Sequence, residues 1–383
     1  MQPRVEFVVT ARPSWARIKS LVQATVQKLG PEEIVLTTLG PVNSRFFGGF
    51  HEEVPEGLIH RSHHTLLDND SLTTVGLSAI EGSRSLLQQW ESDRPRCVVV
   101  VADRTETLGV TVAASLAQIP VVHVQGGEVS GSIDDRVRDA NSKLADLHLT
   151  TNEQSKANLL KIGEDENRIH IIGCPSIDLV RSILLNNSPA STKSVFKSLN
   201  STGVGVTISS ESEFGIVMFH PDTLHFESTV EWTEQLIRVV EASPRQWIWF
   251  WPNSDFGNSL ISSLLRKARE QGRLQNCRFV INLPPETFIQ LAVLSSVLIG
   301  NSSFGIREAS FLGLPVINLG DRQRKRLRGP NVMDIKTPQE LQSFSIPQDL
   351  PRYPSNTIYG EGNSGQIGAQ ILSSWHPTIK SRN

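Results

Sequence analysis

The chain has 383 residues, of which 38% are hydrophobic and 20% charged, and its formal net charge is −2. This length favours two domains, and the charge balance lacks the basic excess that nucleic-acid binding requires. No apolar stretch reaches the roughly 20 residues that span a bilayer, the N-terminus lacks a signal-peptide pattern, and three scattered cysteines indicate reduced thiols. We therefore expect a soluble cytoplasmic protein that binds neither nucleic acid nor membrane.

Short apolar runs alternate with helical patterns through the first half of the chain. The runs predict strands at 5–10, 34–39, 98–101, 120–124, 147–150 and 169–172. Helices are predicted from Ser14 onward and at 71–90, 105–118, 134–145 and 153–162, with Ser71 and Thr105 as N-caps. The stretch 46–70 carries four histidines without ligand spacing, so we expect an irregular segment and no metal site. This alternation predicts a doubly wound parallel sheet.

The second half repeats the same kind of alternation after a polar zone. Residues 186–212, rich in Asn, Ser, Thr and Gly, read as a linker with one helical patch at 191–199, and 173–175 (GCP) reads as a break. Strands are then predicted at 215–219, 246–251, 278–281, 297–299 and, last, 315–319, and helices at 224–242, 258–270, 285–293 and 366–375. The sequence therefore predicts two Rossmann-like α/β domains, 1–180 and 181–364, facing across a cleft.

Two strand ends of the first half carry acidic side chains. Asp103 and Glu128 closely follow the apolar runs 98–101 and 120–124. Open α/β sheets bind ligands at the carboxyl ends of their strands, so these carboxylates are expected to share one site. The alternative is two solvated loop carboxylates. Asp134 lies four residues before Arg138, so a helical ion pair is the structural interpretation of that acid.

The stretch 300–308 (GNSSFGIRE) follows an apolar strand and leads into a helix, which is the arrangement of a phosphate cradle. Backbone N–H groups and the hydroxyls of Ser302 and Ser303 would point at an anion there, although the Walker spacing is absent. The alternative is a helix cap without a ligand. Glu308 either accepts hydrogen bonds from a ribose diol or only favours the helix start electrostatically.

Cationic side chains near other element ends are further anion-binding candidates. Arg12 lies just before a helix start and Arg322 follows a strand, and each is alternatively a surface arginine. His220 closes a strand and could bind phosphate when protonated or transfer a proton. Cations and N–H donors suit a nucleotide diphosphate, whereas the carboxylates of the first half suit proton transfer at carbon. The combination favours a cleft enzyme that acts on a nucleotide-sugar.

Eight motifs occur in order along the chain: 103–106 (DRTE), 126–135 (GGEVSGSIDD), 173–176 (GCPS), 220–221 (HP), 252–253 (PN), 300–308 (GNSSFGIRE), 318–323 (NLGDRQ) and 359–363 (YGEGN). Together they resemble the hydrolysing UDP-N-acetylglucosamine 2-epimerases of the sialic-acid pathway. The resemblance implies the GT-B architecture, with 365–383 packing back on the first domain. It also implies a homodimer or homotetramer, no cofactor, and UDP with a UDP-2-acetamido sugar as ligands.

The resemblance further implies a reaction in which UDP is eliminated through a glycal and water adds at C1, so that the free 2-epimer, such as N-acetylmannosamine, is released. It places Ser302 and Ser303 on the diphosphate, Glu308 on the ribose, and Arg12 and His220 on the phosphate side. With the interpretation of the strand ends, the catalytic candidates are Asp103, Glu128, Asp134 and His220. The substrate-binding candidates are Arg12, Arg104, Gln125, Asn253, Ser302, Ser303, Glu308 and Arg322.

Two positions depart from the family pattern. Gln125 stands where the family has a glutamate, and Asp139 stands where it has a histidine. An amide cannot accept a proton as a carboxylate can. The departures favour either a changed sugar, such as a UDP-2,4-diacetamido-trideoxyhexose, or a changed proton route through Glu128 and Asp139. Epimerisation without hydrolysis and a catalytically weakened UDP-sugar-binding protein are the alternative functions.

Overall fold

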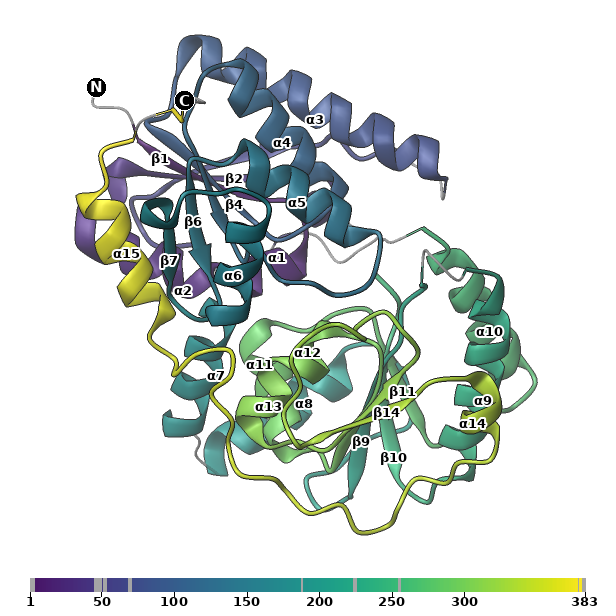
Figure 1. Ribbon diagram of the computed structural model, residues 1–383. Coiled ribbons are helices and arrows are strands. Elements are labelled where there is room, and N and C mark those ends of the chain that lie inside the picture. The colour runs from purple at the N-terminus through teal and green to yellow at the C-terminus, as the bar shows by residue number, and fades with distance from the viewer. Residues whose placement is uncertain are drawn as a thin grey trace. The chain divides into compact units, whose positions relative to one another are not determined.

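The computed structural model describes residues 4–44, 50, 54–67, 71–186, 189–222, 226–253, 256–377 and 379–380. The chain divides into two compact units (Figure 1). Unit 1 comprises Met1–Val129, Ile133–Leu179 and Tyr359–Asn383, and unit 2 comprises Ser130–Ser132 and Val180–Ile358. Unit 1 is therefore completed by the last part of the chain.

Unit 1 is built on a parallel sheet with the strand order β3-β2-β1-β4-β5-β6-β7 among the described residues. The strands are β1 (Val5–Val9), β2 (Ile34–Leu39), β3 (Ile59–His63), β4 (Cys97–Val101), β5 (Val121–Val124), β6 (Leu147–Thr150) and β7 (Ile169–Ile171). The β-branched run of β4 is buried along its whole length, because helices cover both faces of such a sheet. The predicted parallel sheet is confirmed.

The helices of unit 1 are α1 (Arg12–Ala16), α2 (Lys19–Leu29), α3 (Leu72–Ser92), α4 (Thr105–Leu116), α5 (Asp134–Leu144), α6 (Glu153–Lys161) and α15 (Ser364–Ser374), and α7 (Pro175–Asn186) leads out of the unit. Helix α15 lies beside α2, although the two are at opposite ends of the chain (Figure 1). Ser71 caps α3 as predicted, because its Oγ accepts a hydrogen bond from the Thr74 N–H.

Unit 2 contains a second sheet with the order β14-β13-β12-β9-β10-β11-β8 in the described part of the chain, parallel except for β8. Its strands are β8 (Val204–Gly205), β9 (Phe214–Met218), β10 (Gln246–Phe250), β11 (Cys277–Val280), β12 (Val297–Gly300), β13 (Val316–Leu319) and β14 (Val332–Ile335). Its helices are α8 (Pro189–Ser201), α9 (Thr229–Ala242), α10 (Asn258–Glu270), α11 (Pro285–Leu294), α12 (Ser303–Ile306), α13 (Glu308–Leu312) and α14 (Pro338–Gln342).

Two strands contradict the sequence predictions. Strand β3 lies in the stretch that was expected to be irregular, and β14 follows the strand that was expected to be last. Both are edge strands and both have mostly exposed or half-buried side chains. An edge strand needs no continuous apolar run, so neither gives the pattern of a buried strand. Part of the stretch 46–70 lies outside the described residues.

Helix boundaries supply the remaining corrections. In the predicted linker 186–212, helix α8 (Pro189–Ser201) contains the predicted helical patch 191–199 and extends beyond it at both ends. Pro175, interpreted as part of a break, opens α7, since a proline fits the first helical turn. Thr105 is the first residue of α4 rather than its N-cap, and α1 begins at Arg12 rather than at Ser14. Helix α9 begins at Thr229, and the predicted start at 224 lies outside the described residues.

A buried charged cluster attaches the last described residues to unit 1. The Glu164 carboxylate accepts hydrogen bonds from His148 Nε2 (3.1 Å) and Lys380 Nζ (2.8 Å), and Lys143 Nζ lies 2.7 Å from it. Burial raises the pKa of Glu164, but the hydrogen bonds from His148, Lys143 and Lys380 outweigh burial and lower the pKa to about 2. The ionised carboxylate therefore stabilises the folded state.

This lowered pKa predicts a specific loss of stability in acid. Glu164 contributes fully above its ordinary pKa of 4.5, and the contribution disappears as the pH falls toward 2. The contribution is up to about 3 kcal/mol. In urea titrations, Glu164→Gln should be less stable than wild type at pH 7, and the gap should narrow by more than half at pH 3. Glu166→Gln, at an exposed partner of Lys156, is the control. A gap that stays constant with pH would contradict this assignment.

No helix among the described residues combines the length and the apolar character that a membrane crossing needs.

Candidate active site

Each sheet has one position at which the strand order reverses. In unit 1, strands β1 and β4 are neighbours there, and in unit 2 the neighbours are β9 and β12. The connections leave such a pair of strands in opposite directions, which opens a crevice at their carboxyl ends where α/β sheets bind ligands. Arg12 and Asp103 follow the strands of the first pair, and His220 and Asn301 follow those of the second. The candidate residues therefore lie at the expected edge of each sheet.

Arg138 links the acidic groups of unit 1. Its side chain is 1% exposed, and its Nη1 donates to Asp135 Oδ1 (2.6 Å) and to the Glu128 carbonyl (2.7 Å). Its Nη2 pairs with Asp103 Oδ2. Burial lowers the pKa of Arg138, but the charges of Asp103, Asp135 and Asp134 outweigh burial and raise it. The guanidinium therefore stays charged and holds two carboxylates and the Glu128 backbone together.

This arrangement partly corrects the prediction for Asp134 and Arg138. Asp134 contributes its charge, but the carboxylate on helix α5 that hydrogen-bonds Arg138 is Asp135, three residues away. Arg138 and Asp135 are therefore site residues that were not predicted from the sequence. The available signal was their spacing of three, which places two side chains on the same face of a helix as well as a spacing of four does.

The backbone that presents Asp103 is in an uncommon conformation. Ala102, which precedes it, has φ +63°, and Gln125 at the end of β5 has φ +65°. The left-handed region costs a non-glycine residue about 1–2 kcal/mol. His123 Nε2 donates to the Ala102 carbonyl (2.8 Å), and Asn141 donates to the same oxygen (3.3 Å). Burial lowers the pKa of His123 to about 3, so this ring is a neutral structural group.

The side chain of Gln125 is directed toward a thiol. It is 1% exposed, and its Nε2 donates to Cys174 Sγ at 3.0 Å. Cys174 Sγ lies in turn 2.9 Å from Ser176 Oγ.

The other departure from the family pattern, Asp139, lies on α5. Partial burial is the main cause of its raised pKa, and the charge of Asp135 raises the pKa further. Among the described residues, no group of three or more His, Cys, Asp or Glu could hold a metal ion.

In unit 2, Asn301 fixes the position of His220. Its Oδ1 accepts from the His220 N–H (2.8 Å), and its Nδ2 donates to the His220 carbonyl (2.7 Å). The Asn253 N–H donates to His220 Nδ1 (3.3 Å). In the neutral ring the proton is therefore on Nε2, which makes that atom a donor. Asn301 belongs to a predicted motif, but this role was not predicted from the sequence.

The predicted phosphate cradle, 300–308, includes Asn301 and continues with two serines. Ser302 caps the short helix α12, because its Oγ accepts a hydrogen bond from the Phe304 N–H (3.4 Å). Ser303 Oγ accepts from Arg307 Nη2 (3.1 Å), and Arg307 Nε lies 3.8 Å from Glu308 Oε2.

The carbonyl of Asn301 holds the loop after β13. Arg322 Nη1 donates to it (3.5 Å), and so does Gln323 Nε2 (3.1 Å). The carboxyl edge of this sheet thus brings His220, Asn253 and Arg322 together around Asn301. Ser302 and Ser303 follow Asn301 at the same edge.

In unit 1, Arg104 pairs with Glu106 (3.2 Å) at the start of α4.

These observations define a protein with two Rossmann-like domains, each with polar side chains at the reversal of its strand order. The same fold is found in the crystal structure of UDP-GlcNAc 2-epimerase from Neisseria meningitidis bound to UDP-GlcNAc. The TM-score is 0.73 at 18% identity, with 97% of this chain and 99% of that chain covered. The predicted fold class is confirmed.

Sequence comparison identifies the family. The family described as UDP-N-acetylglucosamine 2-epimerase matches residues 44–373, so the chain belongs to this family, as its motifs predicted. The chain is 28% identical to UDP-N-acetylglucosamine 2-epimerase of Neisseria meningitidis, over 94% of this chain and 92% of the relative. It is 31% identical to UDP-N,N'-diacetylbacillosamine 2-epimerase (hydrolyzing) of Legionella pneumophila, over 74% of this chain and 72% of the relative.

Proposed function

We propose that the protein is a hydrolysing 2-epimerase that converts a UDP-2-acetamido sugar to UDP and the free 2-epimer. The observation that carries this proposal is the ion pair between the buried Arg138 and Asp103, the carboxylate that follows β4 and that we propose as an acid–base group. The hydrolysing activity in the name of the Legionella relative supports it, and the UDP-GlcNAc bound to the Neisseria structure supports the class of substrate.

The proposed reaction is an elimination followed by an addition. A carboxylate removes the proton from C2, the C1–O bond breaks, and UDP leaves with the bonding electrons, so that a C1–C2 double bond forms. Water then adds its oxygen to C1, and a proton returns to C2 from the opposite face. The steps are redox-neutral, and they require an acid and a base held in place, for which we propose Asp103 and one of Asp134 and Glu128.

The residues of unit 2 suit the leaving group. Nε2 of His220 is a donor in the neutral ring, and it becomes one of two N–H donors when the ring is protonated. Together with Ser302, Ser303 and Arg12 it would bind the diphosphate, while Glu308 would bind the ribose. Arg104, Gln125, Asn253 and Arg322 would complete the substrate contacts. A cytoplasmic location and assembly into homodimers or homotetramers are parts of the same proposal.

The proposal is tested by following UDP-GlcNAc and UDP-2,4-diacetamido-trideoxyhexoses by NMR in D₂O. UDP and a free sugar with inverted C2 should appear together, with deuterium at C2. Asp103→Asn should abolish both signals, whereas Asp349→Asn, at an exposed acid of unit 2, should leave them unchanged. Release of a sugar that keeps its C2 configuration, or of one without deuterium, would refute the mechanism.

Two alternatives have their own outcomes in the same experiment. The name of the Neisseria relative gives 2-epimerisation of UDP-N-acetylglucosamine, so the first alternative is an epimerase that returns the intact nucleotide-sugar as its C2 epimer. Gln125 favours a weakened protein that binds UDP in calorimetry but turns over no tested sugar. The first would give a new UDP-sugar without free UDP, and the second would give no change.

Restoring the family's glutamate discriminates between a weakened and a re-tuned site. The buried pocket around Gln125 presents the thiol of Cys174, which suits a neutral amide. We expect Gln125→Glu to lower turnover and to reduce the free energy of unfolding at pH 7 by about 1–3 kcal/mol. Burial raises the pKa of such a glutamate, so the deficit in stability should shrink as the pH falls. A gain in turnover would instead indicate a weakened site.

A further inference from the structure

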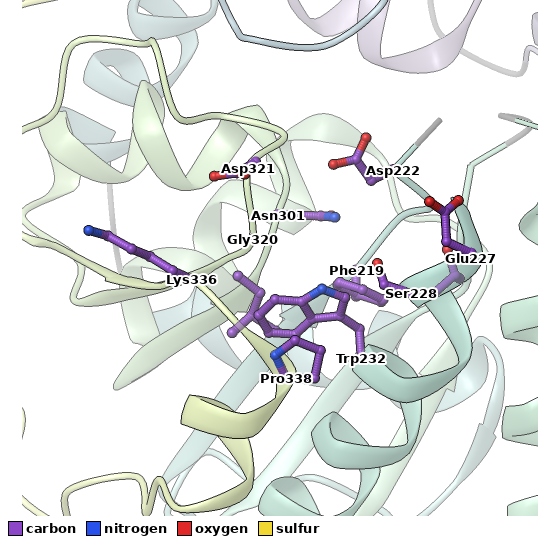
Figure 2. Close-up of a pocket in the computed structure, with 12 residues that line it drawn as sticks. Phe219, Asp222, Glu227, Ser228, Trp232, Asn301, Gly320, Asp321, Lys336 and Pro338 are labelled. Carbon is purple, nitrogen blue, oxygen red and sulfur yellow. The ribbon is translucent and has the colours of Figure 1, made fainter. Parts of the chain in front are cut away.

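A pocket in unit 2 is not used by the proposed reaction. It has a volume of about 220 Å³ and lies at the carboxyl ends of β9, β12 and β13, next to the first turns of α9 and α14 (Figure 2). Its lining residues are Phe219, Asp222, Glu227, Ser228, Thr229, Trp232, Asn301, Leu319, Gly320, Asp321, Lys336 and Pro338. Pockets for drug-sized ligands run from about 300 to 1,000 Å³, so this one suits a single ring rather than a nucleotide-sugar.

Trp232 supplies a hydrogen-bond donor to this pocket. Its side chain is 8% exposed, yet its indole N–H makes no hydrogen bond to another described residue. Figure 2 shows the indole nitrogen on the edge of the ring nearest Asn301, within the pocket lining. The indole nitrogen itself keeps some solvent access, so its N–H is available to a ligand atom with a lone pair.

Carboxylates supply hydrogen-bond acceptors on the other side. Asp222, Glu227 and Asp321 all belong to the lining, and in Figure 2 their carboxylates lie on the side of the pocket opposite the apolar floor of Trp232 and Pro338. Lys336 also belongs to the lining, but its ammonium group extends away from the other labelled side chains (Figure 2). Arg324 Nη1 lies 3.7 Å from Asp321 Oδ2, but Asp222 and Glu227 still make the lining acidic, which disfavours phosphates and other anions.

These two features narrow the class of ligand. A bare cation would suit the carboxylates but could not accept a hydrogen bond from Trp232, and an anion would be repelled by the rim. A hydroxyl group both accepts and donates, and the non-polar face of a pyranose suits an apolar floor. We propose that this pocket binds a neutral sugar of the 2-acetamido-hexose class, with one hydroxyl on the Trp232 N–H and others on the carboxylates. The choice of sugar rests on the proposed function.

The location gives such binding a consequence. Asn301 belongs to the pocket lining, and its side chain makes both hydrogen bonds to the backbone of His220. A sugar in the pocket would therefore lie beside the residue that positions a proposed catalytic group. The free sugar that the proposed reaction releases belongs to the same chemical class. The pocket would therefore become occupied when this product accumulates.

The test is a binding measurement on the full chain without nucleotide. Saturation-transfer NMR should detect N-acetylglucosamine or N-acetylmannosamine on wild type. Trp232→Phe keeps most of the ring but removes the N–H, and it should weaken binding about tenfold, as expected for one lost hydrogen bond. Trp375→Phe, the same substitution in unit 1, is the control. Glu227→Gln should weaken binding without changing the fold, and the Kd for UDP should stay within twofold of wild type in all three variants.

The outcomes separate this site from the proposed function. Sugar binding that depends on Trp232 supports the pocket even if no UDP-sugar is turned over. Absence of sugar binding at tens of millimolar, or binding that Trp232→Phe leaves unchanged, would overturn it. Displacement of the sugar by spermidine or Mg²⁺ would also overturn it, because the pocket would then be a cation site.

Discussion

Replacing Arg138 with methionine should reduce the free energy of unfolding by about 3–5 kcal/mol, because two carboxylates lose the buried charge that compensates them. Asp103 and Asp135 are then left with like charges near each other, and the Glu128 carbonyl loses its donor. Epimerase activity should disappear together with this arrangement. Urea denaturation at pH 7 measures the first effect, and the NMR time course measures the second.

The pH dependence of this variant distinguishes lost charge from lost packing. Without the guanidinium, the pKa values of Asp103 and Asp135 in the folded state should rise, so the deficit in stability should narrow as the pH falls from 7 to 5. Arg136→Met, at an exposed arginine of the same helix, should behave like wild type. If the two variants were equally stable, Arg138 would not be holding the acids as described.

Asn301→Asp should lower kcat/KM for the UDP-sugar about a hundredfold, the penalty expected when a reacting group is displaced by about 1 Å. The substitution keeps the shape of the side chain but replaces the Nδ2 donor with an oxygen that faces the His220 carbonyl. The loop that carries His220 should therefore shift. The loss should appear as a lower kcat rather than a higher KM, because His220 is proposed to act on the departing diphosphate.

Asn331→Asp is the matched control for this experiment. Asn331 is likewise buried, donates its Nδ2 to a carbonyl, that of Leu314 (2.8 Å), and accepts a hydrogen bond from Ser310 (3.0 Å). Both variants should lose stability, about 1–3 kcal/mol each, but only Asn301→Asp should lose activity. Equal activity in the two variants would show that Asn301 is a structural residue alone.

Buried strands were predictable from the sequence, and edge strands were not. The run of valines in β4 could only suit a strand covered on both faces, so its position followed directly from composition. Strand β3 has the sequence IHRSH, and among the described residues it pairs with β2 alone, so burial selects its side chains only weakly. The same holds for β14, which pairs with β13 alone in the part of the chain that the structure describes. Pairing to a neighbour, rather than local pattern, creates these two strands.

The edge of the sheet where the candidates lie was predictable, but the contacts among them were not. Asp103 and His220 each follow an apolar run, and parallel strands bring such positions to one edge. Arg138 has two aspartates within helical reach, and only the packing of α5 against α4 and β5 selects Asp135 together with Asp103. Gln125 and Cys174 are 49 positions apart, so no local pattern joins them.

The return of the chain end to unit 1 sets an order for folding during synthesis. Apart from Ser130–Ser132, unit 2 is one continuous segment, Val180–Ile358. This segment leaves the ribosome before helix α15, which packs against α2. Unit 1 is synthesised first but stays incomplete until helix α15 covers α2. Unit 2 is synthesised later but can complete its fold first. Domains usually complete themselves in the order of translation. Here the nascent amino-terminal part stays exposed longest, which makes it the portion that chaperones should engage.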